Sequence, residues 1–123
     1  MVLIVDDDEI LVEIIKDLLE INGFIGKCLH GGHAAISWLD HGHNCELLIT
    51  DLQMLNGSGF DLLSWVQANR PELKVIIVTG TSKSEMHETE QFGELLHIPV
   101  ISKPFTGDKL ISVIDKVFKD NKN

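Results

Sequence analysis

The chain has 123 residues and a mass of 13.7 kDa, which allows one compact domain over residues 1–123 and excludes a second. Hydrophobic residues make up 44% and charged residues 24% of the sequence, a balance typical of globular domains and too apolar for a disordered chain. Nineteen acidic against ten basic side chains give a net charge of −9, which opposes binding to nucleic acid or anionic lipid and favours cations or basic partners.

The first third of the chain predicts a strand, a helix and a second strand. Val2–Val5 is an unbroken apolar run, typical of a parallel strand buried on both faces. Apolar side chains then recur at four-residue steps opposite charged ones, which predicts an amphipathic helix that ends at residues 22–23. Residues 24–29 include a glycine and a lysine, which favours an edge strand. The inward residues expected of the helix are Ile10, Leu11, Ile14, Ile15, Leu18 and Leu19.

The middle of the chain continues this alternation. Gly32–Asp40 predicts a second helix, and the apolar run at 47–49 predicts a buried strand. Residues 58–69 predict a third helix, because Ser58 can cap its start and Pro71 ends it. The inward residues expected of these two helices are Ala35, Ile36, Leu39, Phe60, Leu62, Leu63 and Val66.

The last third is less regular. Residues 75–78 predict a strand, and residues 98–101 predict another that is interrupted by Pro99. Between them, residues 82–96 offer little apolar surface beyond Met86 and Phe92, so we expect only a short or mobile helix. A final helix precedes a polar tail at 119–123, and its inward residues are Leu110, Val113, Ile114, Val117 and Phe118.

Strand and helix thus alternate five times, which predicts a doubly wound α/β fold with a parallel sheet covered on both faces. Ligands of such sheets bind beyond the carboxyl ends of the strands. Each polar residue there has a structural explanation when taken alone, such as a helix cap, a turn, a strand position or a surface charge. These residues are Asp6, Asp7, Asp8, Asp51, Thr79 and Lys103.

Their coincidence at one edge of the sheet favours a functional site. With strand order 2-1-3-4-5 the first and third strands are neighbours about 4.8 Å apart, which places Asp6 and Asp7 beside Asp51. Like charges this close call for a cation, and hard oxygen ligands select Mg²⁺, which also takes phosphate oxygens. The Thr79 hydroxyl and the Lys103 ammonium would then stabilise a phosphoryl group transferred to Asp51 as an aspartyl phosphate.

These motifs give the whole chain a strong resemblance to the receiver domains of two-component response regulators, which have a flavodoxin-like fold. The resemblance implies a signalling domain rather than an enzyme, one that assists its own phosphorylation and dephosphorylation. Asp51 would accept a phosphoryl group from a phosphohistidine on a sensor histidine kinase or a histidine phosphotransfer protein. The matching segments are VLIVDDDE at 2–9, LITDLQM at 48–54, GFDLL at 59–63, VIIVTG at 75–80 and SKPF at 102–105.

The resemblance also assigns a metal site and a switch. Mg²⁺ would be bound directly by Asp7 and Asp51, through water by Asp6, and by the backbone carbonyl of Gln53. Thr79 would move toward the phosphoryl group, and phosphorylation would shift an existing equilibrium at the face formed by the fourth helix, fifth strand and fifth helix.

Further details of the site follow from the same resemblance. The bond between Lys103 and Pro104 is expected to be cis, which X-Pro bonds tolerate at little cost. Separately, Gln53 and Thr81 stand two positions beyond Asp51 and Thr79, and from this position at the border of the site we hypothesise that they tune the lifetime of the phosphorylated state.

Three departures from the family pattern affect the switch. Leu55 stands where the family usually has a proline, and residues 56–59 contain two glycines that make the following loop more flexible. Val100 replaces an aromatic residue that in many members rotates inward with the threonine, so that aromatic switch cannot operate here. The region after Thr79 is divergent as well.

Two other functions compete with this hypothesis. A haloacid dehalogenase-like phosphohydrolase has a nucleophile in an Asp-x-Asp pattern after its first strand, and Asp6 and Asp8 match that spacing. A degenerate receiver would act only as a binding module. A transition-metal site among the histidines near residues 41–45 is not favoured, because the spacing fits no zinc pattern and a polar loop explains it.

Location is inferred from what the sequence lacks. Its two cysteines, Cys28 and Cys45, are too few for a disulfide scaffold and suit a reducing compartment. No basic segment precedes the first apolar run, and no apolar run is long enough to span a membrane. We therefore expect a cytoplasmic protein that binds neither membrane nor nucleic acid.

Overall fold

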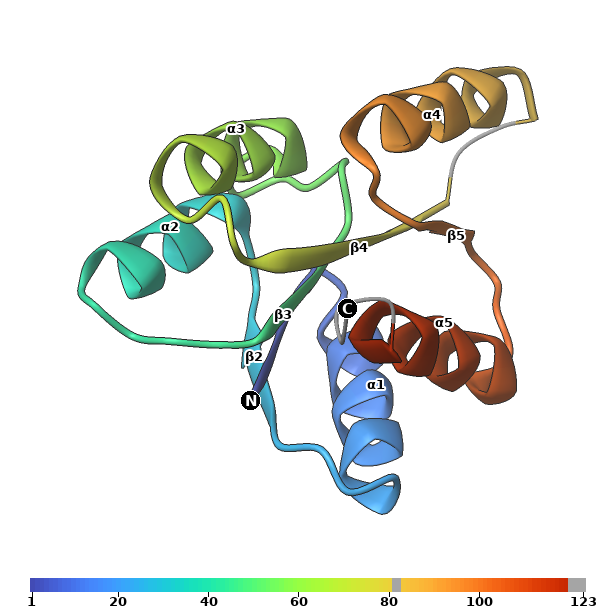
Figure 1. Cartoon of the computed structure of the whole chain (residues 1–123), viewed down its shortest axis with the longest axis horizontal. Coiled ribbons are helices and arrows are strands. Elements are labelled where there is room, and N and C mark those ends of the chain that lie inside the picture. The colour runs from blue at the N-terminus through green and yellow to red at the C-terminus, as the bar shows by residue number, and fades with distance from the viewer. Residues whose placement is uncertain (81–82, 120–123) are drawn as a thin grey trace.

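The computed structural model describes residues 1–80 and 83–119, and strands alternate with helices throughout (Figure 1). The strands are all parallel, in the order β2-β1-β3-β4-β5, which confirms the predicted topology. Strands occupy Val2–Val5 (β1), Gly26–Leu29 (β2), Leu47–Thr50 (β3), Lys74–Thr79 (β4) and Val100–Ser102 (β5). Helices occupy Glu9–Ile21 (α1), Gly32–Asp40 (α2), Gly59–Asn69 (α3), Lys83–Leu96 (α4) and Gly107–Lys119 (α5).

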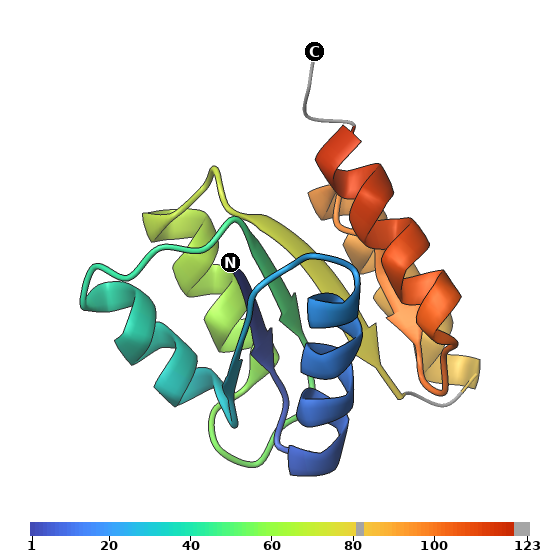
Figure 2. The ribbon, with the colours of Figure 1, turned by 90° about the horizontal axis from the view of Figure 1, so that it is seen from below.

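Two hydrophobic layers lie on opposite faces of the sheet. Successive side chains of a strand point to opposite faces, so Val2 and Ile4 join α1 and α5, while Leu3 and Val5 join α2 and α3. Figure 2 shows the strands pointing toward one edge, between these helical layers. Helix α4 also packs on the second layer, through Phe92. The arrangement is the doubly wound α/β fold that the alternation predicts.

The buried stripe of α1 differs from the predicted one. Val12, Ile15 and Leu19 are buried, whereas Ile10 and Ile14 are 74% and 57% exposed. Each residue of an α-helix turns by about 100°, so positions two residues either side of Val12 point away from the sheet. The prediction that Ile10 and Ile14 lie inward is therefore wrong, and α1 carries exposed apolar residues near its start.

Two other packing predictions are corrected. Phe60 lies at the first turn of α3 with half of its side chain exposed, and its ring contacts that of Phe92 edge to face. The inward residues Leu62, Leu63 and Val66 of the same helix are buried as predicted. Strand β5 begins at Val100 rather than residue 98, although the Pro99 carbonyl still accepts a hydrogen bond from Ile77.

Helix α4 spans 14 residues, so of the expected short or mobile helix the first alternative is wrong. Its close approach to the sheet explains how a helix with few apolar residues is held. A Cβ added at Gly93 would lie 2.6 Å from both the Ile98 carbonyl oxygen and Val100 Cγ2. Glycine thus allows α4 to contact β5 directly. Residue 82, where the helix is expected to begin, falls outside the described residues.

The predicted helix ends are confirmed. Asp8 Oδ1 accepts hydrogen bonds from the N–H groups of Ile10 and Leu11, and Ser58 Oγ accepts one from Phe60 N–H. Asn22 ends α1, and Gly23 follows with a φ of 87°. Side-chain oxygens here satisfy N–H groups that the first helical turn leaves unpaired.

The histidine-rich segment is the polar loop that its sequence predicts. Arg70 donates hydrogen bonds to Asn44 Oδ1 and to the carbonyls of Leu39 and His43, while the rings of His43 and Trp38 stack. Across residues 1–80 and 83–119, no group of three or more His, Cys, Asp or Glu side chains is arranged to hold a metal ion. Within the same residues, no helix combines the length and apolar character needed to cross a membrane.

Both cysteines are free thiols, as expected. Burial is the largest influence on the Cys45 thiol and raises its pKa to about 11, and burial also raises the pKa of Cys28.

Candidate functional site

Strand register brings the candidate residues to one edge of the sheet. Val5 of β1 pairs with Thr50 of β3, and Asp51 N–H donates a hydrogen bond to the Val5 carbonyl. The residues that follow these strands are therefore neighbours, as strand order predicts. At the other side, Lys103 N–H donates to the Thr79 carbonyl, so β5 delivers its lysine beside the end of β4.

The Lys103 ammonium joins two carboxylates. Its Nζ lies 2.7 Å from Asp6 Oδ2 and 2.8 Å from Asp51 Oδ2. The carboxylates are almost fully buried, at 5% and 8% exposure, and the lysine side chain is 24% exposed. Charged hydrogen bonds of this length are strong in a partly desolvated setting. The lysine thus offsets the repulsion between two acids that lie 97 and 52 residues before it in sequence.

Burial and pairing act in opposite directions on these groups. Burial is the largest influence on Asp6 and raises its pKa above the ordinary carboxyl value, although the hydrogen bond from Lys103 opposes it. Burial alone would lower the pKa of Lys103, but its hydrogen bonds to Asp51 and Asp6 outweigh burial and raise that pKa. Lys103 is therefore held as a cation at neutral pH.

The Asp51 carboxylate is fixed through both oxygens. Its Oδ1 accepts hydrogen bonds from the N–H groups of Leu52 at 2.7 Å and Gln53 at 3.2 Å, while its Oδ2 faces Lys103. The chain turns tightly here, because a Cβ on Gly59 would lie 2.0 Å from the Asp51 carbonyl oxygen. Only glycine permits that approach.

Asp7 is half-buried and points toward a different neighbour. Its Oδ2 accepts a hydrogen bond from Leu55 N–H at 3.1 Å. A hollow of about 380 Å³ lies between Asp7 and the segment after β3, with Gln53 and Leu55 among its lining residues. Asp7 thus faces the β3–α3 loop, while Asp6 faces the lysine.

The β3–α3 loop is anchored at its far side as well. The carbonyls of Asn56 and Gly57 accept hydrogen bonds from the N–H groups of His33 and Gly32, at the start of α2. Gly57 adopts a φ of 94°, in the left-handed region that favours glycine. Gly57 thus allows close contact with the start of α2, because an added Cβ there would lie 2.5 Å from His33 N.

Thr79 is buried, at 1% exposure, and its hydroxyl has no hydrogen-bond partner among the described residues. A buried hydroxyl without a partner costs stability. Such a group at the edge of the sheet, one strand from Asp51, is suited to bind an oxygen that arrives with a ligand.

The donor set fits a divalent cation in charge and chemistry. Asp6, Asp7 and Asp51 carry three formal negative charges, which Lys103 balances only in part, and all offer the hard oxygen atoms that Mg²⁺ selects. Two of the three share the lysine, and Asp7 binds a backbone N–H. The carboxylates therefore converge on one edge without forming a ready-made cluster around a single point.

Some features of the site escape sequence reasoning. The Leu55 N–H and the carbonyls of Asn56 and Gly57 are backbone groups, whose partners depend on loop geometry. The sequence feature that could have indicated the contact between these two loops is the glycines at 31–32 and at 57, since glycine often marks close approach of two backbones. The cis bond between Lys103 and Pro104 is confirmed.

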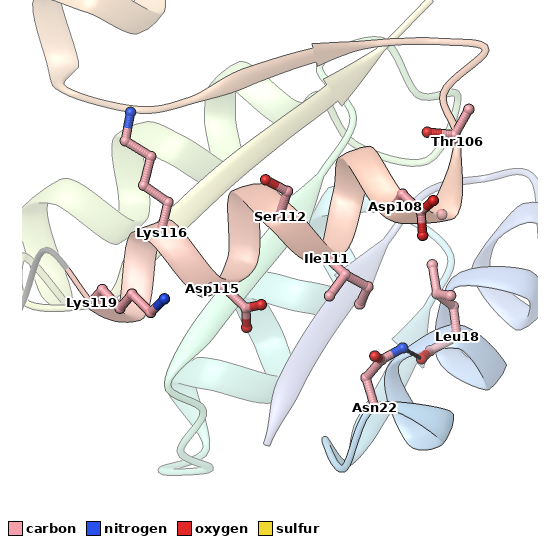
Figure 3. Close-up of a pocket in the computed structure, with 10 residues that line it drawn as sticks. Leu18, Asn22, Thr106, Asp108, Ile111, Ser112, Asp115, Lys116 and Lys119 are labelled. Atoms are coloured by element: carbon pink, nitrogen blue, oxygen red, sulfur yellow. Dashed lines mark hydrogen bonds between the residues drawn. The ribbon is translucent and has the colours of Figure 1, made fainter.

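A separate groove of about 750 Å³ runs between α1 and α5 (Figure 3). Leu18 and Asn22 line it from α1, and Ile111 and Asp115 line it from α5. It includes none of the residues that surround Lys103. The chemistry at the sheet edge and the hollow between these helices are therefore different features of the molecule.

Comparison with known proteins identifies the family. The model of the response regulator receiver domain matches residues 2–115, and the chain belongs to this family. It is 35% identical over 122 residues to the chemotaxis protein CheY of Pseudomonas aeruginosa, covering 96% of this chain and 95% of the relative. It is also 27% identical to the transcriptional regulatory protein CpxR of Escherichia coli, of which it spans 49%.

Solved structures agree with this assignment. A CheY-like receiver domain from Methanospirillum hungatei superposes with a TM-score of 0.85 at 25% identity, covering 98% of this chain and 95% of that one. A receiver protein from Pseudomonas putida gives a TM-score of 0.79 at 29% identity, with 94% of each chain covered. The fold is flavodoxin-like. Phosphoryl acceptance in two-component signalling is the function of the family, which replaces the phosphohydrolase alternative.

The lysine bridge yields a test of stability. Lys103→Met keeps the aliphatic stem but leaves Asp6 and Asp51 unpaired, so we expect the free energy of unfolding at pH 7 to fall by about 2 kcal/mol. Burial already raises the pKa of Asp6, and the variant removes the lysine that opposes this rise. As the pH falls through that raised pKa, Asp6 takes up a proton and the deficit shrinks.

Urea denaturation of both proteins at pH 7 and pH 4 measures this difference. A deficit that is equal at both pH values, or larger at pH 4, would contradict the role given to the bridge.

Proposed function

We propose that Asp51 is the phosphoacceptor of this receiver domain, and that the donor is a phosphohistidine on a sensor histidine kinase or a histidine phosphotransfer protein. In the transfer, an Asp51 carboxylate oxygen forms a bond to phosphorus as the bond from phosphorus to the histidine nitrogen breaks. The released imidazole takes up a proton. The backbone N–H groups of Leu52 and Gln53 support this role, because they hold one carboxylate oxygen and so orient the side chain.

The observation that carries the proposal is the Thr79 hydroxyl, which is buried without a partner among the described residues at the end of β4, the strand next to β3. A phosphoryl group on Asp51 brings oxygen atoms that accept hydrogen bonds. The Thr79 hydroxyl would donate a hydrogen bond to one of them. The Lys103 ammonium would move from the Asp51 carboxylate to bind the phosphoryl group. Both side chains then stabilise charge that is absent before transfer.

Mg²⁺ is the cation that this acidic edge would hold. Asp7 and Asp51 would bind it directly, Asp6 through water, and Gln53 through its backbone carbonyl. The charge that Lys103 leaves unbalanced supports this assignment, as does the position of the Gln53 peptide next to Asp51. When bound, the ion supplies positive charge to phosphoryl oxygens.

The output of the switch is assigned to the surface of α4, β5 and α5. Contact between Gly93 and Val100 supports a coupling in which α4 responds to β5 without a rotating aromatic ring. Gln53, which is exposed beside the site, would tune the lifetime of the phosphorylated state. Thr81, given the same role, falls outside the described residues. As a phosphorelay component the domain would act in the cytoplasm. It would bind partner proteins and would not itself bind nucleic acid.

The acceptor is tested by labelling. Incubation with acetyl phosphate and Mg²⁺ should add one phosphoryl group to the wild-type protein, detected by intact-mass spectrometry, and Asp51→Asn should abolish it. Asp8→Asn is the control, because Asp8 caps α1 and its change should preserve labelling. Equal labelling of Asp51→Asn and wild type would refute the acceptor, and no labelling of the wild type would favour a receiver that only binds partners.

Substitution of Thr79 tests the proposal further, because it should change the rate of phosphorylation without lowering the free energy of unfolding. Thr79→Val removes a hydroxyl that has no partner among the described residues and keeps the side chain's shape. We expect the free energy of unfolding to stay within about 0.5 kcal/mol of wild type or to increase. The rate of phosphorylation by acetyl phosphate should fall at least about tenfold. Substantial destabilisation with an unchanged rate would show that the hydroxyl is structural.

The donor protein would approach along α1. This helix begins directly after the acidic residues, and Ile10 and Ile14 expose apolar surface that the core does not use. Exposed apolar residues beside a reactive site are suited to a protein partner.

Ile14→Glu should therefore slow phosphotransfer from a purified phosphorylated histidine kinase by about tenfold or more. Ile21→Glu is the matched control, since Ile21 is exposed at the far end of the same helix. Both variants should react with acetyl phosphate at the wild-type rate. Equal slowing of kinase transfer by the two variants would count against docking near Ile14.

A further inference from the structure

Leu55 has an exposed side chain and a backbone N–H that is hydrogen-bonded within the site. Its side chain is 91% exposed, yet its N–H donates a hydrogen bond to Asp7 Oδ2 across 48 residues of sequence. The side chain therefore contributes little to the fold, and the residue's contact with the site is made through the main chain.

The loop that carries Leu55 is held on both sides. Gly31, which precedes α2, provides no side-chain cap, and the carbonyls of Asn56 and Gly57 accept hydrogen bonds from N–H groups of the first turn of α2 instead. On the other side, Gln53 N–H is bound to Asp51. Leu55 lies between these anchors, so the direction of its N–H is set by the backbone around it.

A proline at this position would lack that donor. The chain differs from the usual family pattern here, since Leu55 replaces a proline and supplies a hydrogen bond to an acidic residue of the site. Hydrogen bonds to carboxylates that ligate metals orient those ligands, and their loss weakens metal binding by about 10- to 100-fold in other sites.

We infer that Leu55 is a positioning residue whose backbone N–H holds the Asp7 carboxylate toward the β3–α3 loop, and thereby increases the affinity of the acidic edge for a divalent cation. This inference rests on the proposed function, in which Asp7 is a Mg²⁺ ligand. Asp7 has few other restraints in the described residues, since the lysine bridge engages Asp6 and Asp51. The Leu55 hydrogen bond thus confines a carboxylate that would otherwise sample several rotamers.

Two substitutions separate the N–H from the side chain. Leu55→Pro removes the donor, at a position that is not among the described residues with positive φ. Leu55→Ala keeps the donor and removes most of the exposed side chain. Calorimetric titration with MgCl₂ should give a dissociation constant about fivefold or more higher for Leu55→Pro than for wild type, and an unchanged constant for Leu55→Ala.

A metal-free measurement covers the case in which Leu55→Pro does not fold. In the protein without metal, the Leu55 amide should exchange with deuterium more slowly than an exposed amide, and Asp7→Ala should accelerate that exchange. Amides in the core of β3 serve as the control and should keep their rates in Asp7→Ala.

The outcomes distinguish this inference from the proposed function. Equal Mg²⁺ affinity of wild type and Leu55→Pro, an equal loss in Leu55→Ala, or Leu55 exchange that is insensitive to Asp7→Ala would each overturn the inference alone. A wild-type protein that binds no Mg²⁺ would overturn the proposed metal site, and the inference with it.

Discussion

The lysine that joins two buried carboxylates is the interaction on which the site depends. Asp6 and Asp51 end neighbouring strands, where parallel register forces them together. Without a cation between them, their repulsion and burial would oppose formation of this edge. Lys103 supplies that cation from the far side of the sheet, at 2.7 and 2.8 Å. The pairing therefore stabilises this edge of the fold and holds two buried carboxylates against one shared cation. A phosphoryl group would offer the same lysine a more highly charged partner.

Most of the architecture follows from the sequence because short apolar runs and amphipathic segments alternate so regularly. The same alternation determines which residues lie at the strand ends, so the sequence pattern alone is enough to locate Asp6, Asp51, Thr79 and Lys103 there. Errors arise where several side chains compete for one helical face. In α1 there are apolar residues on two faces, and periodicity alone does not reveal that Val12 rather than Ile10 or Ile14 faces the sheet.

The contacts that escape prediction are those of the main chain. A residue's identity reports its side chain, while the partners of its N–H and carbonyl groups depend on the path of the loop. The bond from Leu55 to Asp7 and the contacts of Asn56 and Gly57 with α2 are of this kind. They link the acidic edge to α2, a helix that supplies no side chain to the lysine bridge. The loop after β3 is therefore part of the site's framework as well as the connection to α3.

The contact between Gly93 and Val100 limits which side chains fit between α4 and β5. A single added carbon at position 93 would overlap both a carbonyl oxygen and a methyl group of the segment leading into β5. The space beside β5 is thus filled by the backbone of α4 and by the small branched side chain of Val100. An aromatic ring at position 100 would need that same volume, so a bulky switch residue and a tightly seated α4 are alternative ways to fill it.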